Sequence, residues 1–260
     1  MRSIKVCILL VATVFSMHGF WGCSPSGQDK GGKSPFVTIQ FGTLPVIQAL
    51  PLFVAAEKGY FKDAGLDVEL VPFNSAMEKD VAMSAGQISG YFGDMITPMV
   101  LTANGTLVKI VATHFNIKNE QRMFAILAGP KYPKKDLHAL SSAGIACSSN
   151  TMLDYLMTRL LQKKGIAANT INLVEVKSIP IRLQMLMSDQ VPAAILPEPL
   201  VTLAEMKGAR VMIDDRKTGL TPTVLVFSDQ FLAKNPDAVK AFLQAVQKGN
   251  DYINKNPDEE

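Results

Sequence analysis

Two kinds of hydrophobic pattern follow one another through most of the chain. Residues 37–41 alternate apolar and polar side chains, which is the period of a strand with one face buried. Residues 153–161 instead place leucine and methionine every three or four positions, which is the spacing of one buried helix face. The two patterns alternate at intervals of about ten to fifteen residues, and this alternation predicts a mainly parallel sheet with helices on both faces.

Turn and cap residues divide the pattern into elements. We expect strands over 37–41, 66–70, 88–92, 107–112, 144–147, 171–176, 193–196, 211–213 and 223–227. We expect helices over 51–58, 76–85, 98–104, 152–164, 181–187 and 236–254, with further short helices before Gly208 and after Ser228. Ser75 with Glu78 forms a capping box for the second of these helices, and Thr97 followed by Pro98 is expected to start the third.

The second half of the chain repeats the order of the first. Residues 85–90 and 188–193 occupy the same place in the two halves, where a helix ends and runs into a strand. The helix over 236–254 is expected to pack on the first half. The sequence therefore predicts two similar α/β lobes.

The first residues have the layout of a secretory signal. Arg2 and Lys5 precede an apolar run over 6–15, which is shorter than the roughly 20 apolar residues of a transmembrane helix. We interpret 1–22 as a signal peptide and Gly22-Cys23 as a lipoprotein box with Cys23 as the lipidated residue, followed by a flexible glycine- and serine-rich linker over 23–34. The alternative is a plain signal peptide in which Cys23 is incidental.

Composition excludes some other classes. The net charge of +3 comes from scattered lysines without a basic run, so we expect no nucleic-acid partner. Neither the three cysteines nor the three histidines have metal-ligand spacing, so we expect no metal site, no cofactor and no disulfide framework. Cys147 lies in an apolar strand and is interpreted as an inert core thiol.

Several segments together resemble one known family. Residues 51–61, 65–70, 85–88, 148–151 and 197–199 resemble, in order and spacing, periplasmic substrate-binding proteins of ABC transporters, in the thiamine-precursor, sulfonate and taurine class (NMT1/THI5-like, SsuA-like). This resemblance implies a two-lobed Venus-flytrap fold of type II with two connecting strands, placed near 124–127 and 223–227. It then implies lobe 1 over 35–123 plus 228–260 and lobe 2 over 124–227. Members of the family usually continue further, so the end at Glu260 predicts a short member or a truncated chain.

Loops at the carboxyl ends of strands are where open α/β sheets bind ligands, and the resemblance points to the same loops. The candidate ligand-binding residues are Thr43, Leu44, Pro45, Gly93, Asp94, Thr97, Ser148, Ser149, Asn150, Thr151, Pro180, Arg182 and Glu198. No catalytic residue is predicted.

Each candidate also has a purely structural interpretation. The hydroxyls and amide of 148–151 suit a sulfonate, phosphate or carboxylate at a helix start, yet one of them could simply cap the helix. Asp94 could accept hydrogen bonds from a ligand amine or only cap its turn. Glu198 between two prolines would favour a cationic ligand if it faces the cleft, or else be a solvated carboxylate. Arg182 would neutralise an anion, or lie on a solvated helix face.

These patterns lead to one main functional prediction and two alternatives. We expect a monomeric solute-binding lipoprotein on the periplasmic or cell-surface face of a bacterial membrane, which captures a small polar or anionic molecule and delivers it to ABC transporter permease subunits. One alternative is a ligand sensor that acts through a partner. The other is an enzyme of the pyrimidine-synthase or menaquinone-pathway branch of the fold, although the cysteine-rich motif of the pyrimidine-forming relatives is absent from the sequence.

Overall fold

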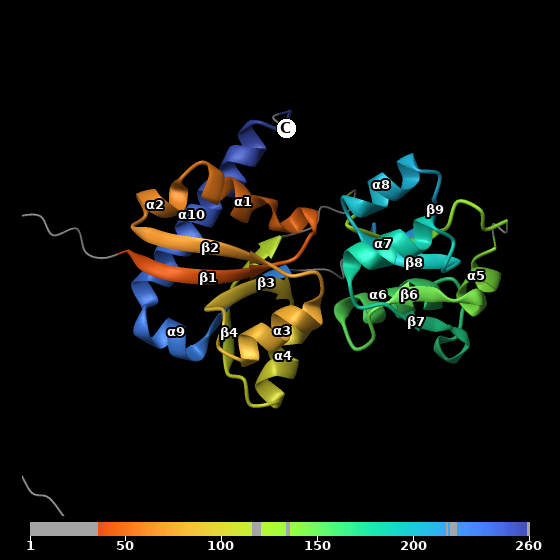
Figure 1. Cartoon of the computed structure of the whole chain (residues 1–260), viewed down its shortest axis with the longest axis horizontal. Helices are drawn as coiled ribbons and strands as arrows, with labels where there is room; N and C mark the ends of the chain where they lie inside the picture. Colours follow the sequence, from red (N-terminus) through yellow and green to blue (C-terminus); the bar gives the residue numbers. More distant parts are fainter. Residues whose placement is uncertain (1–35, 116–120, 134–135, 217, 219–222, 259–260) are drawn as a thin grey trace, which may run out of the picture. The chain divides into compact units, whose positions relative to one another are not determined.

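Two five-stranded sheets carry the fold of the computed structural model, which describes residues 36–115, 121–133, 136–216, 218 and 223–258 (Figure 1). The predicted signal peptide, Cys23 and the linker lie outside these residues. We call the first sheet with its covering helices lobe 1, and the second sheet with its helices lobe 2.

The first sheet has the strand order β2-β1-β3-β10-β4. Its strands are β1 (Val37–Thr43), β2 (Leu66–Pro72), β3 (Gly90–Asp94), β4 (Val108–Phe115) and β10 (Thr223–Ser228). β1 pairs in parallel with β2 and β3, whereas β10 lies antiparallel between β3 and β4. Four of the five strands therefore run the same way.

The second sheet has the equivalent order β7-β6-β8-β5-β9. Its strands are β5 (Phe124–Ala128), β6 (Ile145–Cys147), β7 (Leu173–Glu175), β8 (Ala193–Pro197) and β9 (Arg210–Asp214). β6 pairs in parallel with β7 and β8, and β5 lies antiparallel between β8 and β9. The prediction of two similar, mainly parallel lobes is confirmed.

The antiparallel strands correct the predicted division of the chain. β5 and β10 do not bridge the lobes, because each is fully hydrogen-bonded inside one sheet. The chain crosses between lobes just before each of these strands. β10 belongs to lobe 1, so assigning 223–227 to lobe 2 was wrong: the flanking strands β3 and β4 both need it as a partner.

Helices cover both faces of each sheet. Lobe 1 carries η1 (Ile47–Ala49), α1 (Leu50–Glu57), α2 (Tyr60–Asp63), α3 (Ala76–Ser84), α4 (Ile96–Ala103), α9 (Asp229–Lys234) and α10 (Pro236–Lys255). Lobe 2 carries α5 (Leu137–Ala143), α6 (Met152–Gln162), η2 (Ala168–Thr170), α7 (Ile179–Met187) and α8 (Leu200–Met206). The predicted capping box is present at α3, where the Ser75 side chain accepts a hydrogen bond from the backbone N–H of Glu78.

The start of α4 differs from the prediction. Asp94, not Thr97, caps this helix: its Oδ1 accepts from the backbone N–H groups of Ile96 and Thr97. Thr97 is buried inside the first turn and its hydroxyl donates to Asp94 Oδ2. Because the Asp94 carboxylate satisfies these two N–H groups, the helix begins at Ile96, two residues before the expected start at Pro98.

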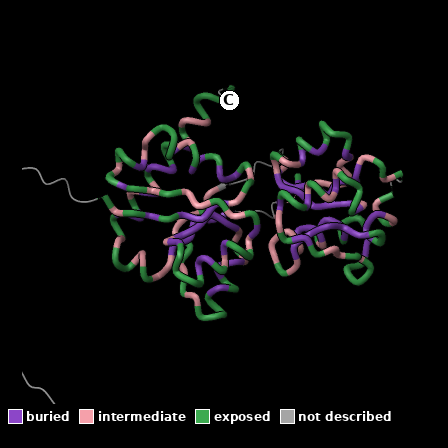
Figure 2. Tube along the Cα trace, viewed as in Figure 1, coloured by how far each residue is buried: buried purple, intermediate pink, exposed green. Residues whose placement is uncertain are grey.

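The cores follow the alternation of the strands, as the buried segments in Figure 2 show. In β10, Leu225 and Phe227 pack with α1, α2 and α10, while Val224 and Val226 pack with α3 and α4 on the other face. β5 divides its side chains in the same way between α5 and α6 on one face and α7 and α8 on the other. Each lobe thus has a core layer on both sides of its sheet.

The last helix completes the core of lobe 1, as predicted. Phe242 of α10 is fully buried, and its ring centroid lies 4.6 Å from that of Phe41, 5.0 Å from Phe61 and 5.3 Å from Phe227. A side chain at Gly249 would place its Cβ 2.4 Å from the carbonyl oxygen of Pro51. The backbones of α1 and α10 therefore approach more closely there than any other residue would allow.

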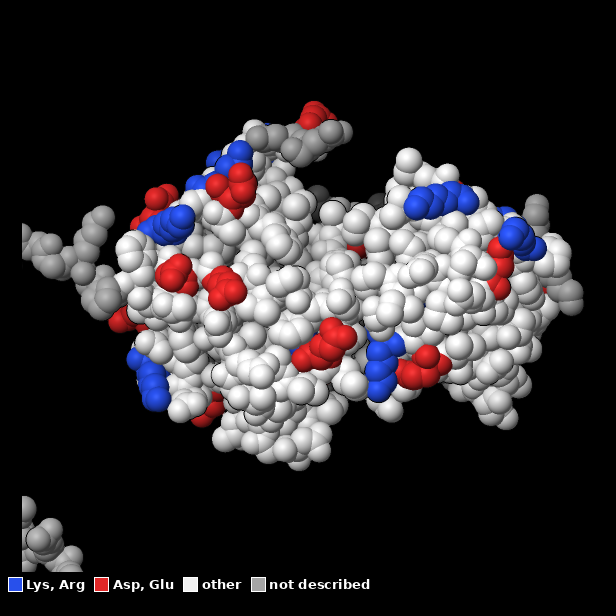
Figure 3. All heavy atoms as spheres, in the orientation of Figure 1, with Lys and Arg blue, Asp and Glu red and all other residues white. Residues whose placement is uncertain are grey.

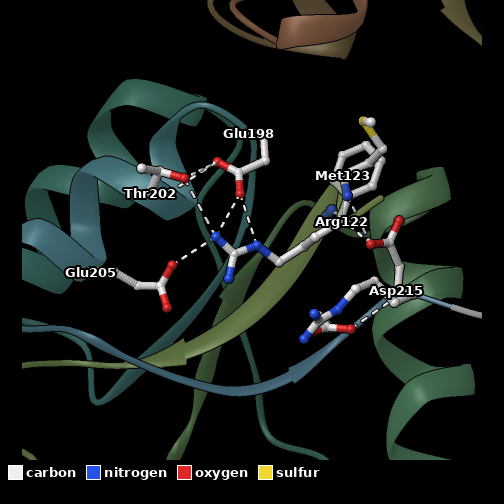
Figure 4. Close-up of polar contacts among 9 residues, drawn as sticks. Arg122, Met123, Glu198, Thr202, Glu205 and Asp215 are labelled. Atoms are coloured by element: carbon white, nitrogen blue, oxygen red, sulfur yellow. Dashed lines mark hydrogen bonds and ion pairs between the residues drawn. The ribbon is translucent and has the colours of Figure 1, made fainter. Parts of the chain in front are cut away.

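Polar contacts tie the two inter-lobe crossings to lobe 2 (Figure 4). Arg122, just before β5, donates to Glu198 Oε1 at 2.8 Å and forms an ion pair with Glu205 at 2.7 Å. Asp215, just after β9, is buried and its Oδ1 accepts from the backbone N–H groups of Met123 and Phe124 at 2.9 and 3.1 Å. The bonds from Asp215 hold the residue after β9 beside the residues that lead into β5.

The surface has a mixed charge. On the face drawn in Figure 3, acidic and basic side chains are interspersed over both lobes. Among the described residues, no helix has the length and apolar character needed to cross a bilayer.

Candidate functional site

A hollow lies where the strand ends of the two sheets face each other. Leu44 follows β1, Asp94 ends β3, Ser148 follows β6 and Pro197 ends β8, and all four line it. It contains about 590 Å³ of space not occupied by atoms, counting the part that opens to solvent. We call this the interlobe hollow. It lies at the carboxyl ends of the parallel strands, where α/β sheets bind ligands.

The two lobes touch next to the hollow through two backbone hydrogen bonds. The N–H of Ile47 in lobe 1 donates to the carbonyl of Glu198 in lobe 2 at 2.8 Å. The N–H of Ile179 in lobe 2 donates to the carbonyl of Asn74 in lobe 1 at 2.9 Å. These contacts hold the walls together while leaving the hollow between them.

The structure brings about half of the predicted site residues together. Those that line the hollow are Leu44, Gly93, Asp94, Ser148, Thr151 and Arg182. Asp94 is engaged as the cap of α4, but a carboxylate has room for further donors. The structural and the ligand-binding interpretations of Asp94 are therefore compatible.

The other predicted residues lie outside the lining. Thr43 is buried and donates to the carbonyl of Val71, and Thr97 is engaged by Asp94. The backbone N–H of Ser149 donates to Glu175, and that of Asn150 donates to Asp154. Pro45, after β1, and Pro180, in the first turn of α7, are both exposed.

Glu198 has a structural role. Its carboxylate is held by Arg122, and its Oε2 accepts from the backbone N–H and the hydroxyl of Thr202 at 3.0 and 2.9 Å. This caps α8 and satisfies the carboxylate inside lobe 2 (Figure 4). The hypothesis that Glu198 attracts a cationic ligand is not supported, because its charge is already compensated and it does not line the hollow.

Arg182 is the most unusual group in the wall. It is fully buried, and its guanidinium donates to the carbonyls of Val176 and Ile195 at 3.0 to 3.1 Å. Among the residues that the structure describes, no carboxylate forms an ion pair with Arg182, and burial lowers its pKa from the ordinary value. The alternative that Arg182 lies on a solvated helix face is wrong. The guanidinium therefore brings a buried positive charge, hydrogen-bonded to backbone carbonyls, to the wall of the hollow.

Sequence reasoning missed most of the apolar wall and three residues with polar side chains. The missed residues include Gln48, Phe92, Phe124, Lys177, Ile179 and Thr223. Gln48 left a signal, because it is the single polar side chain in the apolar run 44–56. The sequence around Thr223 gives no such signal, because Thr223 reaches the hollow only through the pairing of β10 with β3 in lobe 1.

A hydrogen bond from a histidine side chain holds the backbone of Gln48 in place. His114 Nε2 lies 3.0 Å from the carbonyl oxygen of Gln48 and donates to it, and the His114 ring packs edge-on against Phe92 at 5.5 Å. Burial lowers the pKa of His114 to about 4. The imidazole is therefore neutral at neutral pH and holds this part of the wall.

Comparison with known proteins identifies the family. A family model described as NMT1/THI5 like matches residues 46–260, which is more than half of the chain. The chain belongs to the NMT1/THI5-like family. The resemblance seen in the sequence is thereby confirmed.

Individual relatives of this NMT1/THI5-like chain are distant. It is 26% identical to the riboflavin-binding protein RibY of Chloroflexus aurantiacus, over all of this chain and 76% of that protein. It is 23% identical to a 4-amino-5-hydroxymethyl-2-methylpyrimidine phosphate synthase of Saccharomyces cerevisiae, over 85% of this chain and 68% of that enzyme. The chain spans between 63% and 76% of the length of the curated relatives it matches.

Solved structures share the fold. The alkanesulfonate-binding protein SsuA from Xanthomonas axonopodis pv. citri bound to MOPS superposes with a TM-score of 0.75 at 17% identity, covering 86% of this chain and 76% of that one. At this identity the likeness shows the fold alone. The predicted two-lobed periplasmic-binding-protein fold is confirmed.

Proposed function

We propose that this protein is the solute-binding component of an ABC importer. It captures a small polar organic or anionic ligand, such as a thiamine precursor or a sulfonate, in the interlobe hollow and delivers it to membrane permease subunits. The observation that carries this proposal is the hollow itself, whose walls come from the strand ends of both lobes. A ligand that contacts both walls favours the closed arrangement, which a permease then recognises.

The polar groups of the hollow suit a ligand with negative charge or strong acceptors. Arg182 supplies a buried cation without a carboxylate partner among the described residues, and Lys177 adds a second positive charge, whose Nζ lies 3.0 Å from the sulfur of Met77. Ser148, which follows β6 in lobe 2, also lines the hollow. Apolar side chains such as Phe92, Phe124 and Ile179 form the rest of the lining of the hollow and favour a ligand with an apolar body.

We propose that the protein has no catalytic activity of its own. Cys147 is fully buried and burial raises the pKa of its thiol to about 12, so it remains a protonated core thiol. The relationship to a yeast pyrimidine phosphate synthase keeps an enzymatic role as the alternative. Formation of a new pyrimidine product by the purified chain would favour that alternative.

The proposal is tested by a ligand screen with thermal unfolding as the readout. Residues 35–260 are heated with thiamine precursors, riboflavin, sulfonates, inorganic oxyanions and aromatic acids. A ligand at a hundredfold its Kd adds about 2.7 kcal/mol to the free energy of unfolding, which raises Tm by several degrees. A saturable shift with one class supports solute binding. If every class leaves Tm unchanged at millimolar concentration, the proposal fails and a sensory role with a different effector gains weight.

We further propose that Cys23 is lipidated and anchors a monomer to the outer face of the membrane. The motif Gly22-Cys23 after an apolar run supports this. Expressed from its full sequence in bacteria, the wild-type protein is expected in the membrane fraction with a mass increase at Cys23. The Cys23→Ser variant is expected to be released or to remain uncleaved. Equal membrane association of the two, with no added mass in the wild type, would contradict lipid anchoring.

A further inference from the structure

The hollow contains an amide that has no hydrogen-bond partner. Gln48 is only 1% exposed, and within the described part of the chain neither its Nε2 nor its Oε1 has a hydrogen-bond partner. A buried carboxamide without partners costs free energy comparable to the loss of its hydrogen bonds, so such groups are rare unless something else satisfies them. Gln48 lies in the wall of the hollow, where a ligand is the nearest source of partners.

A second unpartnered group lies in the same wall. The hydroxyl of Thr223 is buried, and its Oγ1 has no hydrogen-bond partner among the residues that the structure describes. Thr223 is the first residue of β10 and pairs in register with Asp94 of β3, so it sits at the same strand ends. Both unpartnered groups thus belong to lobe 1 and line one side of the hollow.

The local structure holds Gln48 in a fixed position. On one side the ring of His114 donates to its carbonyl, and on the other the N–H of the preceding residue, Ile47, donates to Glu198 of lobe 2. The segment Ile47–Ala49 therefore contacts both lobes when they are together. A group placed in this way selects ligands by geometry, because it is not free to turn toward solvent.

The chemistry of an amide determines what it selects. A carboxamide presents one acceptor and two donor hydrogens on a single plane, so its best partner offers a donor and an acceptor side by side. Sulfonate and nitrate groups offer acceptors only and leave Oε1 unsatisfied. Amide, lactam and ring-imide edges satisfy both atoms.

We propose that Gln48 is the specificity-determining residue of the hollow, and that it pairs with a neutral N–H/C=O edge of the ligand such as a carboxamide, lactam or ring imide. This rests on the proposed function, since it names the class of ligand taken by the same site. Thr223 adds one hydrogen bond beside this edge. The apolar wall that includes Phe92 holds the body of the ligand.

The test compares Gln48→Leu with a matched variant, Gln87→Leu, whose glutamine is exposed on lobe 1 away from the hollow. Affinity is measured by calorimetric titration with two groups of probes. Riboflavin, uracil and nicotinamide carry the N–H/C=O edge, whereas an alkanesulfonate, nitrate and nicotinate do not.

The expected result has two parts. The wild type and Gln87→Leu bind a probe of the first group, and Gln48→Leu binds it tenfold to hundredfold more weakly, with a smaller loss for Thr223→Val. Without ligand, Gln48→Leu melts at the same or a higher temperature than the wild type, because it removes an unpaired buried amide. A merely structural glutamine would give the opposite change.

Three outcomes overturn the proposal. Tight binding of the alkanesulfonate or nitrate, unchanged in Gln48→Leu, would leave solute binding standing and refute the role of Gln48. A lower melting temperature of ligand-free Gln48→Leu with unchanged affinity would show that an internal water satisfies the amide. Failure of the wild type to bind any probe of the first group would refute this inference, and the proposed function would fail with it only if the whole ligand screen described above also gave no binding.

Discussion

Replacing Phe242 by alanine is expected to lower the free energy of unfolding by about 3–5 kcal/mol, the range for large-to-small changes of a buried phenylalanine. The ring is fully buried and touches three other phenylalanine rings, from β1, α2 and β10. The cavity would open in the middle of the core that joins α10 to the sheet of lobe 1. For a chain of this size we expect Tm to fall by about 10 °C.

Phe53→Ala is the matched control. Phe53 lies in α1, on the same lobe, but 45% of its surface is exposed. Its loss is expected to change the free energy of unfolding by less than about 1 kcal/mol. Denaturant titration of both variants measures the difference. Similar values for the two would mean that α10 does not pack on lobe 1 in the way the structure shows.

The second large effect is a loss of stability in mild acid caused by His114. Its pKa is lowered by burial to about 4, whereas the ordinary value is 6.5. The unfolded chain therefore binds a proton at higher pH than the folded chain does. Stability is fully retained above pH 6.5, falls as the pH drops toward 4, and then levels off, with a total loss of at most about 3 kcal/mol from this group.

The His114→Gln variant isolates this contribution. The carboxyls of Asp80 and Asp215, whose pKa values are raised by burial, titrate in the wild type and the variant alike. We expect the difference in unfolding free energy between wild type and variant to shrink or reverse between pH 7 and pH 4.5. His138 is exposed in the first turn of α5, so His138→Asn serves as the control variant. A wild-type-minus-variant difference that stays constant with pH would refute the buried neutral imidazole.

Much of the fold was predictable because strands and helices have distinct periods. The alternation over 37–41 and the helix face over 153–161 both matched elements of the structure. The order of elements gave two equivalent lobes. What the periods could not show was the partner of each strand: β10 carries an apolar run like its neighbours, and only its pairing with β3 and β4 assigns it to lobe 1.

The site was predictable to the extent that it depends on strand ends. Leu44, Asp94 and Ser148 follow from that rule alone and line the hollow. Gln48 and Thr223 do not, because their importance lies in having no partner, and partners depend on packing across the whole lobe. The burial of Arg182 was missed for a related reason: a single helical arginine gives no sign of the carbonyls that will surround it.

The central position of β10 has a consequence for a growing chain. β4 pairs only with β10 in the first sheet, so it has no place there until residues 223–228 have been made. The second sheet needs nothing beyond Asp214. The half of the molecule that is synthesised first is therefore the half whose sheet is completed last, and lobe 2 is the only one that an uninterrupted stretch of chain can assemble.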